Sequence, residues 1–467
     1  MRFGLLELKS GIHYRSVLPG LAWPAFPGPH AASKLALLFQ IEQGQWRTEK
    51  EIAAAQFEQV KRVTAFAVET VPYYRERLGA GFNRARIDMR SWLDLPILDR
   101  KTLREHGPAF RSVQTPPQHG ASFEMKTSGS TGLVVKLLGN ELTQLFWEVY
   151  CLRDHLWHRR DFGQKLVVMR YQRDPSLKSR VGQSSLGWGS ATDDVVQTGP
   201  AHQFDLVLDV AVLAESLVVQ QPGYVLTHPS VLRGLALHCV KQGIRFPELI
   251  EARTMGETIS DDLRDVCLEA WGVPVTDMYT CQEAGYLALQ CPEHEHLHVQ
   301  SENVLLEVVD VAGQPCLPGQ VGRVLITSLN NFATPLIRYE LGDYAEVGEP
   351  CPCGRGLPVL KRVMGRYRNL LTMPDGSQRW PLIGNEGRLR DIAPIELMQM
   401  IQTSLDQITV RLVMARELND VETRDLTAFI QRNLGYPFRL MFEYVDSIRN
   451  PANGKVEQFI CRSSDLI

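Results

Sequence analysis

The residues of this chain that could do chemistry begin with a Gly/Ser/Thr loop, Lys126-Thr127-Ser128-Gly129-Ser130-Thr131-Gly132. Glycines free the backbone to point several N–H groups at one ligand, and the hydroxyls add further donors. Such a loop can wrap the oxygens of a polyphosphate. It does not fit the Walker pattern GxxxxGK[ST] at any register, and an ordinary flexible loop has the same composition. The loop is therefore a candidate phosphate site on its own evidence.

Further polar residues follow short apolar runs that resemble strands. Gly256-Glu257 ends one such run, and Tyr279 and Glu283 lie at the end of the next. In an open α/β sheet, ligands usually bind beyond the carboxyl ends of the strands. Glu283 is thus a candidate magnesium ligand and Tyr279 a candidate to stack on a base. The alternatives are a core aromatic for Tyr279 and an acid favoured by a helix N-terminus for Glu283.

Three later positions extend the set. Asp343 follows Gly342 and could accept both hydroxyls of a ribose, or could be a plain turn residue. Gly365-Arg366 comes 22 residues later. Lys455 follows Asn453-Gly454 in a turn near the C-terminus, where a lone lysine is most often a solvated surface charge.

A group of cysteines and histidines has spacing typical of a metal site. Cys291 and the histidines His294, His296 and His298 precede the tight Cys351-Pro352-Cys353-Gly354 knuckle, which can aim two thiolates at one metal. The alternative is that these cysteines are small buried apolar residues and that the histidines are solvated.

The elements that must position these residues alternate between strand and helix beyond residue 120, which favours an α/β fold with mostly parallel sheets. Helical spacing is expected over 31–78, 141–158, 206–220, 230–243 and 260–272, and strands over 134–138, 166–170, 224–227 and 273–279. Asp99 is expected to cap a short helix that follows it. A small β-rich subdomain is expected after Glu283. The order of the tail, helix 395–405, strand 408–414, helix 422–433 and strand 440–445, predicts a small α+β domain.

Composition excludes several classes of protein. The chain has 467 residues, a formal net charge of −3, 44% hydrophobic residues and 22% charged residues. These values argue against a disordered chain and against nonspecific binding of nucleic acid. No apolar stretch reaches the ~20 residues that a membrane helix needs, and Glu7 and Lys9 interrupt any signal peptide. Nine scattered cysteines do not form a disulfide framework, so a cytoplasmic protein is expected.

The order of the motifs is more specific than any one of them. TSGSTG, GE, Y-x-x-x-E, GD, GR and GK follow one another over about 330 residues and resemble the adenylate-forming acyl–coenzyme A ligase superfamily. The likeness is greatest to its phenylacetate–coenzyme A ligase-like branch and extends over about residues 40–460. Five further segments carry it: VPYYRERL (71–78), LPILDRKTLREHG (95–107), THPSVLRGLA (227–236), TSLNNFATPLIRYELGD (327–343) and EPCPCGR (349–355).

The resemblance implies a large adenylation domain over residues 1–367 and a small mobile domain over 368–467, with a hinge at Arg368. It assigns Lys455 and Glu283 to catalysis, the latter as the Mg²⁺ ligand. The implied ATP contacts are Thr127, Ser128, Gly129, Ser130, Thr131, Gly132, Gly256, Glu257, Tyr279, Asp343 and Arg366. Three positions depart from the family pattern: Leu133 stands where a lysine is usual, Glu340 where a basic residue is usual, and Arg368 where Asp or Lys is usual.

The implied reaction activates a carboxylic acid, preferably aromatic, as an acyl-adenylate with release of pyrophosphate and then passes the acyl group to coenzyme A. Two alternatives stay open: transfer to an amine, hydroxyl or carrier protein, and a nucleotide-binding relative without turnover. The branch also implies a structural Zn²⁺ held by Cys291, His298, Cys351 and Cys353. Phe146, Trp147, Trp188 and His228 are candidates to line the acyl pocket, or core residues. Expected partners are small molecules and a second copy in a homodimer, with no nucleic acid and no membrane.

Overall fold

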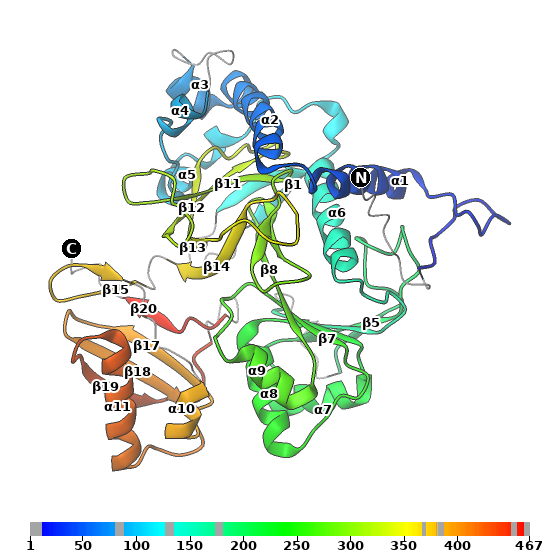
Figure 1. Ribbon diagram of the computed structural model, residues 1–467. Coiled ribbons are helices and arrows are strands. Elements are labelled where there is room, and N and C mark those ends of the chain that lie inside the picture. Colours follow the sequence, from blue (N-terminus) through cyan, green and yellow to red (C-terminus); the bar gives the residue numbers. More distant parts are fainter. Residues whose placement is uncertain are drawn as a thin grey trace. The chain divides into compact units, whose positions relative to one another are not determined.

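The computed structural model (Figure 1) describes residues 12–79, 88–126, 135–172, 181–366, 370–379, 381, 387–449 and 455–461. They form two compact units, each discontinuous in sequence. Unit 1 comprises Met1–Leu166, Ser184–Ala201 and Met278–Val363, and unit 2 comprises Val167–Gln183, His202–Asp277 and Met364–Ile467. The predicted domain boundary at 367/368 lies outside the described residues and stays a prediction, as does the hinge at Arg368.

The helices are α1 (Pro29–Gly44), α2 (Glu49–Thr70), α3 (Pro72–Leu78), α4 (Met89–Leu93), α5 (Arg100–Glu105), the 3-10 turns η2 (Gly107–Phe110) and η3 (Pro117–His119), α6 (Glu141–Trp157), α7 (Val210–Gln220), α8 (Pro229–Gln242), α9 (Leu263–Trp271), α10 (Gly387–Ile392) and α11 (Asp420–Leu434).

The strands are β1 (Ser122–Lys126), β2 (Lys136–Asn140), β3 (Leu166–Arg170), β4 (Gln183–Ser185), β5 (Ala201–Asp205), β6 (Tyr224–Thr227), β7 (Glu251–Met255), β8 (Val275–Cys281), β9 (Gly285–Gln290), β10 (Leu297–Val299), β11 (Val304–Val309), β12 (Val321–Ser328), β13 (Tyr339–Val347), β14 (Val359–Arg366), β15 (Leu371–Thr372), β16 (Gln378–Arg379), β17 (Leu397–Gln402), β18 (Gln407–Val413), β19 (Arg439–Tyr444) and β20 (Phe459–Cys461).

Unit 1 is built on antiparallel strands. Within it the strands follow one another in the order β11-β12-β13-β14-β10-β9-β8, and the pairings β11/β12, β12/β13, β10/β14, β9/β10 and β8/β9 are antiparallel. One apolar core joins these strands to α2 and α3 through residues such as Val60, Ala67 and Tyr74. The β-rich region expected after Glu283 is confirmed.

Asp99 caps α5 as predicted, since its Oδ1 accepts the Thr102 N–H at 2.6 Å.

Unit 2 contains the alternating segment. Its strands follow the order β7-β6-β3-β5, and β6 runs parallel to β7. Helices α7, α8 and α9 connect successive strands along the chain (Figure 1). They pack through buried residues such as Leu213, Leu235 and Val266. The predicted α/β class is therefore confirmed.

The last part of unit 2 is a separate four-stranded sheet in the order β19-β18-β17-β20, with α11 packed against it through Leu426, Ile430 and Leu434 (Figure 1). The predicted helix over 395–405 is wrong: that segment contains β17, antiparallel to β18 and parallel to β20. A short run of Leu, Met, Ile and Gln is compatible with either state. β18 follows it directly as the antiparallel partner, and β20 lies near the C-terminus. Pairing with β18 and β20 therefore determines that this segment is a strand.

All nine cysteines lie in described residues and are free, as expected from their spacing. Among the described helices, none combines the length and apolar character that crossing a membrane requires.

Candidate functional site

The predicted phosphate loop Thr127–Gly132 lies outside the described residues, and so does Leu133. Its flanks are described: β1 leads into it and β2 leads out, as an antiparallel hairpin in which Lys126 and Lys136 are register partners. Glu124 Oε1 lies 3.3 Å from Lys126 Nζ and 3.8 Å from Lys136 Nζ. The hairpin therefore carries two lysines at the base of the loop, where the sequence lacks the usual lysine inside it.

Tyr279 and Asp343 are brought together in unit 1. The Tyr279 hydroxyl donates a hydrogen bond of 2.8 Å to Asp343 Oδ2. Tyr279 lies near the end of β8 and Asp343 is within β13, so the contact joins residues 64 positions apart. The ring of Tyr279 belongs to the buried core, which confirms the alternative of a core aromatic, while its stacking on a base stays a prediction.

Glu283 lies just beyond β8 and is 5% exposed. Arg100, the first residue of α5, places its Nη1 3.7 Å from Glu283 Oε1, an ion pair that sequence reasoning had missed. Between Tyr279 and Glu283 the Cys281 thiol is enclosed, and burial together with the charge of Glu283 raises its pKa well above the ordinary value. The Cys281 thiol therefore stays protonated near neutral pH and adds no charge at this end of β8.

A second group of predicted residues lies in unit 2, around Glu257. The Glu257 side chain is 4% exposed. Its Oε2 accepts the Ser230 N–H at 3.0 Å, and its Oε1 accepts the Val456 N–H at 2.7 Å. His228 Nδ1 lies 3.4 Å from the same Oε1. Burial opposes ionisation, but the nearby His228 together with the Val456 and Ser230 N–H donors outweighs it, so the pKa of Glu257 is lowered.

Lys455, the predicted catalytic lysine, lies over Gly256. A Cβ built on Gly256 would be 3.5 Å from Lys455 Nζ and 3.5 Å from His228 Nε2. Gly256 has φ +82°, a conformation that side chains rarely adopt. The absence of a side chain at Gly256 therefore leaves room for the lysine. Asn453 and Gly454 lie outside the described residues; Arg366 ends β14.

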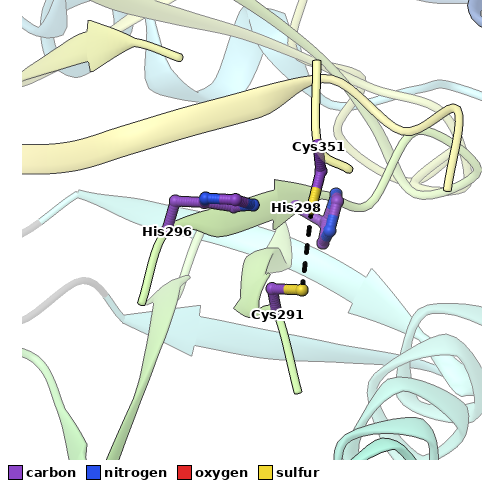
Figure 2. Close-up of side chains that lie close together, drawn as sticks. All are labelled: Cys291, His296, His298 and Cys351. Atoms are coloured by element: carbon purple, nitrogen blue, oxygen red, sulfur yellow. Dashed lines mark hydrogen bonds between the residues drawn. The ribbon is translucent and has the colours of Figure 1, made fainter. Parts of the chain in front are cut away.

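The cysteine and histidine group forms a compact cluster in unit 1 (Figure 2). One donor atom from each of Cys291, His296, His298 and Cys351 lies within 4.8 Å of all the others. The two sulfur atoms of Cys291 and Cys351 are 3.8 Å apart. His296 was not among the four zinc ligands expected from the sequence. Cys353 was expected as a ligand but is outside this group of four, and its Sγ lies 3.4 Å from His298 Nε2.

Burial shifts the pKa values of the groups in this cluster. Burial lowers the pKa of His298 to about 3 and raises that of Cys351 to about 12. The histidine therefore presents a neutral imidazole with a lone pair, which is the form that binds metals. The His298 ring is oriented by the Leu357 carbonyl, 3.4 Å from Nδ1.

Of the four acyl-pocket candidates, Trp147 lies against the start of β9, the strand that follows β8. The Trp147 ring is 4.9 Å from the Tyr286 ring, and a Cβ built on Gly285 would lie 3.3 Å from it. Phe146 extends the group through Tyr150, at 6.4 Å between ring centroids. Trp188 instead packs between His155 and Phe162, and His228 belongs to the Glu257 group.

The comparisons with known proteins agree with this arrangement. Residues 389–462 match the CapK C-terminal domain family. The chain is 27% identical over 356 residues to the phenylacetate–coenzyme A ligase of Thermus thermophilus, covering 72% of this chain and 74% of that protein. It is 24% identical over 209 residues to Protein CapK of Staphylococcus aureus, covering 43% of each chain. A 2-hydroxyisobutyryl–coenzyme A ligase structure, in its postadenylation state with R3-HIB-AMP, superposes with a TM-score of 0.70 at 18% identity, covering 90% and 91% of the two chains.

The chain thus has the fold of a solved acyl–coenzyme A ligase. Its sequence is similar to the phenylacetate–coenzyme A ligases of Thermus thermophilus and Pseudomonas putida, in agreement with the ordered motifs.

Proposed function

We propose that this chain catalyses ATP-dependent activation of a carboxylic acid and transfers the acyl group to coenzyme A. The observation that carries the proposal is the Tyr279–Asp343 pair beside Glu283, because it gathers three residues that the family uses for the nucleotide. Sequence similarity to two phenylacetate–coenzyme A ligases supports it.

Two bond exchanges make up the reaction. A carboxylate oxygen attacks the α-phosphorus of ATP, and the bond to pyrophosphate breaks with its electron pair on the leaving group. The thiol sulfur of coenzyme A then attacks the acyl carbon and AMP leaves. Charge accumulates on the α-phosphate in the first step, so cations and N–H donors placed there supply the main stabilisation.

The residues take these roles in the proposal. Asp343, oriented by Tyr279, accepts the ribose hydroxyls, and Lys455 supplies a cation to the α-phosphate and the carboxylate. The loop 127–132 binds the distal phosphates, while Gly256 lies by the adenine and Arg366 assists at the ribose. Glu283 provides the carboxylate oxygen that Mg²⁺ prefers, and the ion would neutralise phosphate charge.

An aromatic acid is the proposed substrate class. Trp147 places its ring next to Gly285, two residues beyond Glu283, and Tyr286 and Phe146 extend the aromatic group. Trp147 and Phe146 are only partly buried, so their rings can cover an added apolar surface. The aromatic ring of the substrate would pack against these side chains by offset-stacked or edge-to-face contacts.

The test is carboxylate-dependent ATP–pyrophosphate exchange over a panel of aryl, aliphatic and amino acids, because exchange reports adenylation without the acceptor. Exchange with one class of acid, followed by thioester formation when coenzyme A is added, is the expected result. Exchange without thioester points to an amine, hydroxyl or carrier protein as acceptor. ATP binding without exchange for any acid overturns the proposal in favour of a nucleotide-binding scaffold.

We further propose a structural Zn²⁺ at the cysteine and histidine cluster. A tetrahedral zinc with Zn–S bonds of about 2.3 Å sets two sulfurs about 3.8 Å apart, and the Cys291 and Cys351 sulfurs are 3.8 Å apart. Four of the five nearby donors fill a closed shell: Cys291, Cys351 and His298 with either His296 or Cys353. Without an open position the ion would serve the fold and not the reaction.

A further inference from the structure

Glu257 joins three segments of unit 2 that are far apart in sequence. Ser230, at the start of α8, donates its N–H to one carboxylate oxygen, and Val456 donates to the other. His228, the residue before α8, lies beside the second oxygen. The Val456 N–H belongs to the peptide bond that follows Lys455, so this hydrogen bond restrains the lysine backbone directly.

We propose that Glu257 is a positioning residue for Lys455, holding the segment 455–456 so that the ammonium group stays over Gly256. The inference rests on the proposed adenylation and deepens it. It differs from the role expected for Glu257 in the adenine pocket, because both carboxylate oxygens are already engaged by protein N–H groups.

The other end of the same segment is also anchored. The Glu457 carbonyl accepts from Gln399 Nε2 at 2.8 Å, and the Gln458 carbonyl accepts the Met400 N–H at 2.8 Å, both on β17. Glu257 thus ties a strand-bound segment of the small sheet to the loop after β7. A second tie runs parallel to it: Arg233 of α8 is held by Asp262 at 2.8 Å and donates from Nη1 to the Glu396 carbonyl at 3.0 Å.

Charge explains why a carboxylate is required. A neutral amide has one acceptor oxygen, so Glu257→Gln must turn an NH₂ group toward the N–H of either Ser230 or Val456. A buried N–H that faces another donor loses its hydrogen bond and destabilises the folded protein. Hydrogen bonds to a charged acceptor are stronger than those to a neutral one. Of these two donors, the Val456 N–H lies in the segment that carries Lys455, so the loss of its hydrogen bond acts on the lysine.

The test compares Glu257→Gln with Glu251→Gln, a matched control at a buried glutamate of β7 that accepts a hydrogen bond from the Thr276 hydroxyl. We expect Glu257→Gln to lower the kcat of pyrophosphate exchange by about 10- to 100-fold with the KM for ATP unchanged. Thioester formation from supplied acyl-adenylate and coenzyme A stays at the wild-type rate. In a Lys455→Ala background, Glu257→Gln causes no further loss, because the two act as one unit.

A readout independent of activity is trypsin cleavage after Lys455, which we expect to accelerate at least severalfold in Glu257→Gln and not in Glu251→Gln. A raised KM for ATP with unchanged kcat would assign Glu257 to the adenine instead and overturn the inference. The inference is also overturned if Glu257→Gln lowers activity further in the Lys455→Ala background, or if it slows both half-reactions equally. Either result would mean that Glu257 only stabilises the fold. If wild type shows no exchange with any acid, the proposed function fails, and cleavage after Lys455 alone decides whether Glu257 holds the segment.

Discussion

The Tyr279 hydroxyl donates a 2.8 Å hydrogen bond to Asp343 Oδ2 across two strands of unit 1. The phenol is carried on a ring that the apolar core holds in place, so it fixes the carboxylate without a mobile side chain of its own. A carboxylate oriented in this way loses less entropy when it accepts the two hydroxyls of a ribose.

Replacing Tyr279 by phenylalanine removes this orienting bond and keeps the ring. We expect the KM for ATP in pyrophosphate exchange to rise about 5- to 20-fold, the value of one hydrogen bond to a charged group, with a smaller change in kcat. Tyr14→Phe, at an exposed tyrosine, is the control. An unchanged KM for ATP in Tyr279→Phe would remove Asp343 from the nucleotide site.

Lys455→Ala removes the cation proposed for the α-phosphate. We expect adenylation, measured by exchange, to slow by roughly 10²- to 10³-fold, while the folded protein and its ATP affinity change little. Lys361→Ala, at an exposed lysine paired with Glu346, should behave as wild type. Equal activity of the two variants would contradict the role of Lys455.

Metal analysis of the protein purified without chelator should give about one zinc per chain. Cys351→Ser is expected to lose most of the metal and to lower the melting temperature, because a bound ion stabilises only the folded state. Cys316→Ser, at a half-buried thiol outside the cluster, should keep the full metal content. Wild-type protein purified without zinc would contradict the proposed metal site, and the cluster would then consist of packed thiols and imidazoles.

Trp147→Ala tests the substrate pocket. Removing the indole beside Gly285 and Tyr286 opens space and takes away apolar area that a bound acid would bury. We therefore expect the KM of small aromatic acids to rise about 10-fold. Bulkier acids should gain activity relative to them. Trp23→Ala, at a side chain that is 89% exposed, is the control. A uniform loss for every acid would assign Trp147 to packing alone.

The lowered pKa of Glu257 predicts a pH dependence of stability. A carboxyl whose folded-state pKa lies below its unfolded value of about 4.3 stabilises the protein above that value, and the contribution is lost as the pH falls through the folded-state pKa. Urea unfolding of wild type and Glu257→Gln should therefore differ most near pH 6 and converge toward pH 3. A difference that grows in acid would contradict the paired, ionised state.

Several local features could be predicted because neighbours in sequence determine them. The Asp99 cap, strand β3 at Leu166–Arg170 and strand β6 at Tyr224–Thr227 agree with the expected positions. Strand β17 could not be predicted, since its helix-compatible run is stabilised by β18 and β20. For the same reason the Arg100–Glu283 ion pair carries no signal in either local segment.

The order of the motifs in the sequence by itself indicated the resemblance to adenylate-forming ligases, and the sequence supplied the cysteines and histidines available for a metal. Only the tertiary structure decided which donors meet. It brought His296 into the cluster and left Cys353 beside it, because β9 and β10 pair as a hairpin that turns through 291–296. It also joined Glu257 to Val456 across 199 positions. Contacts between distant segments depend on packing and strand register, which residue spacing along the chain does not encode.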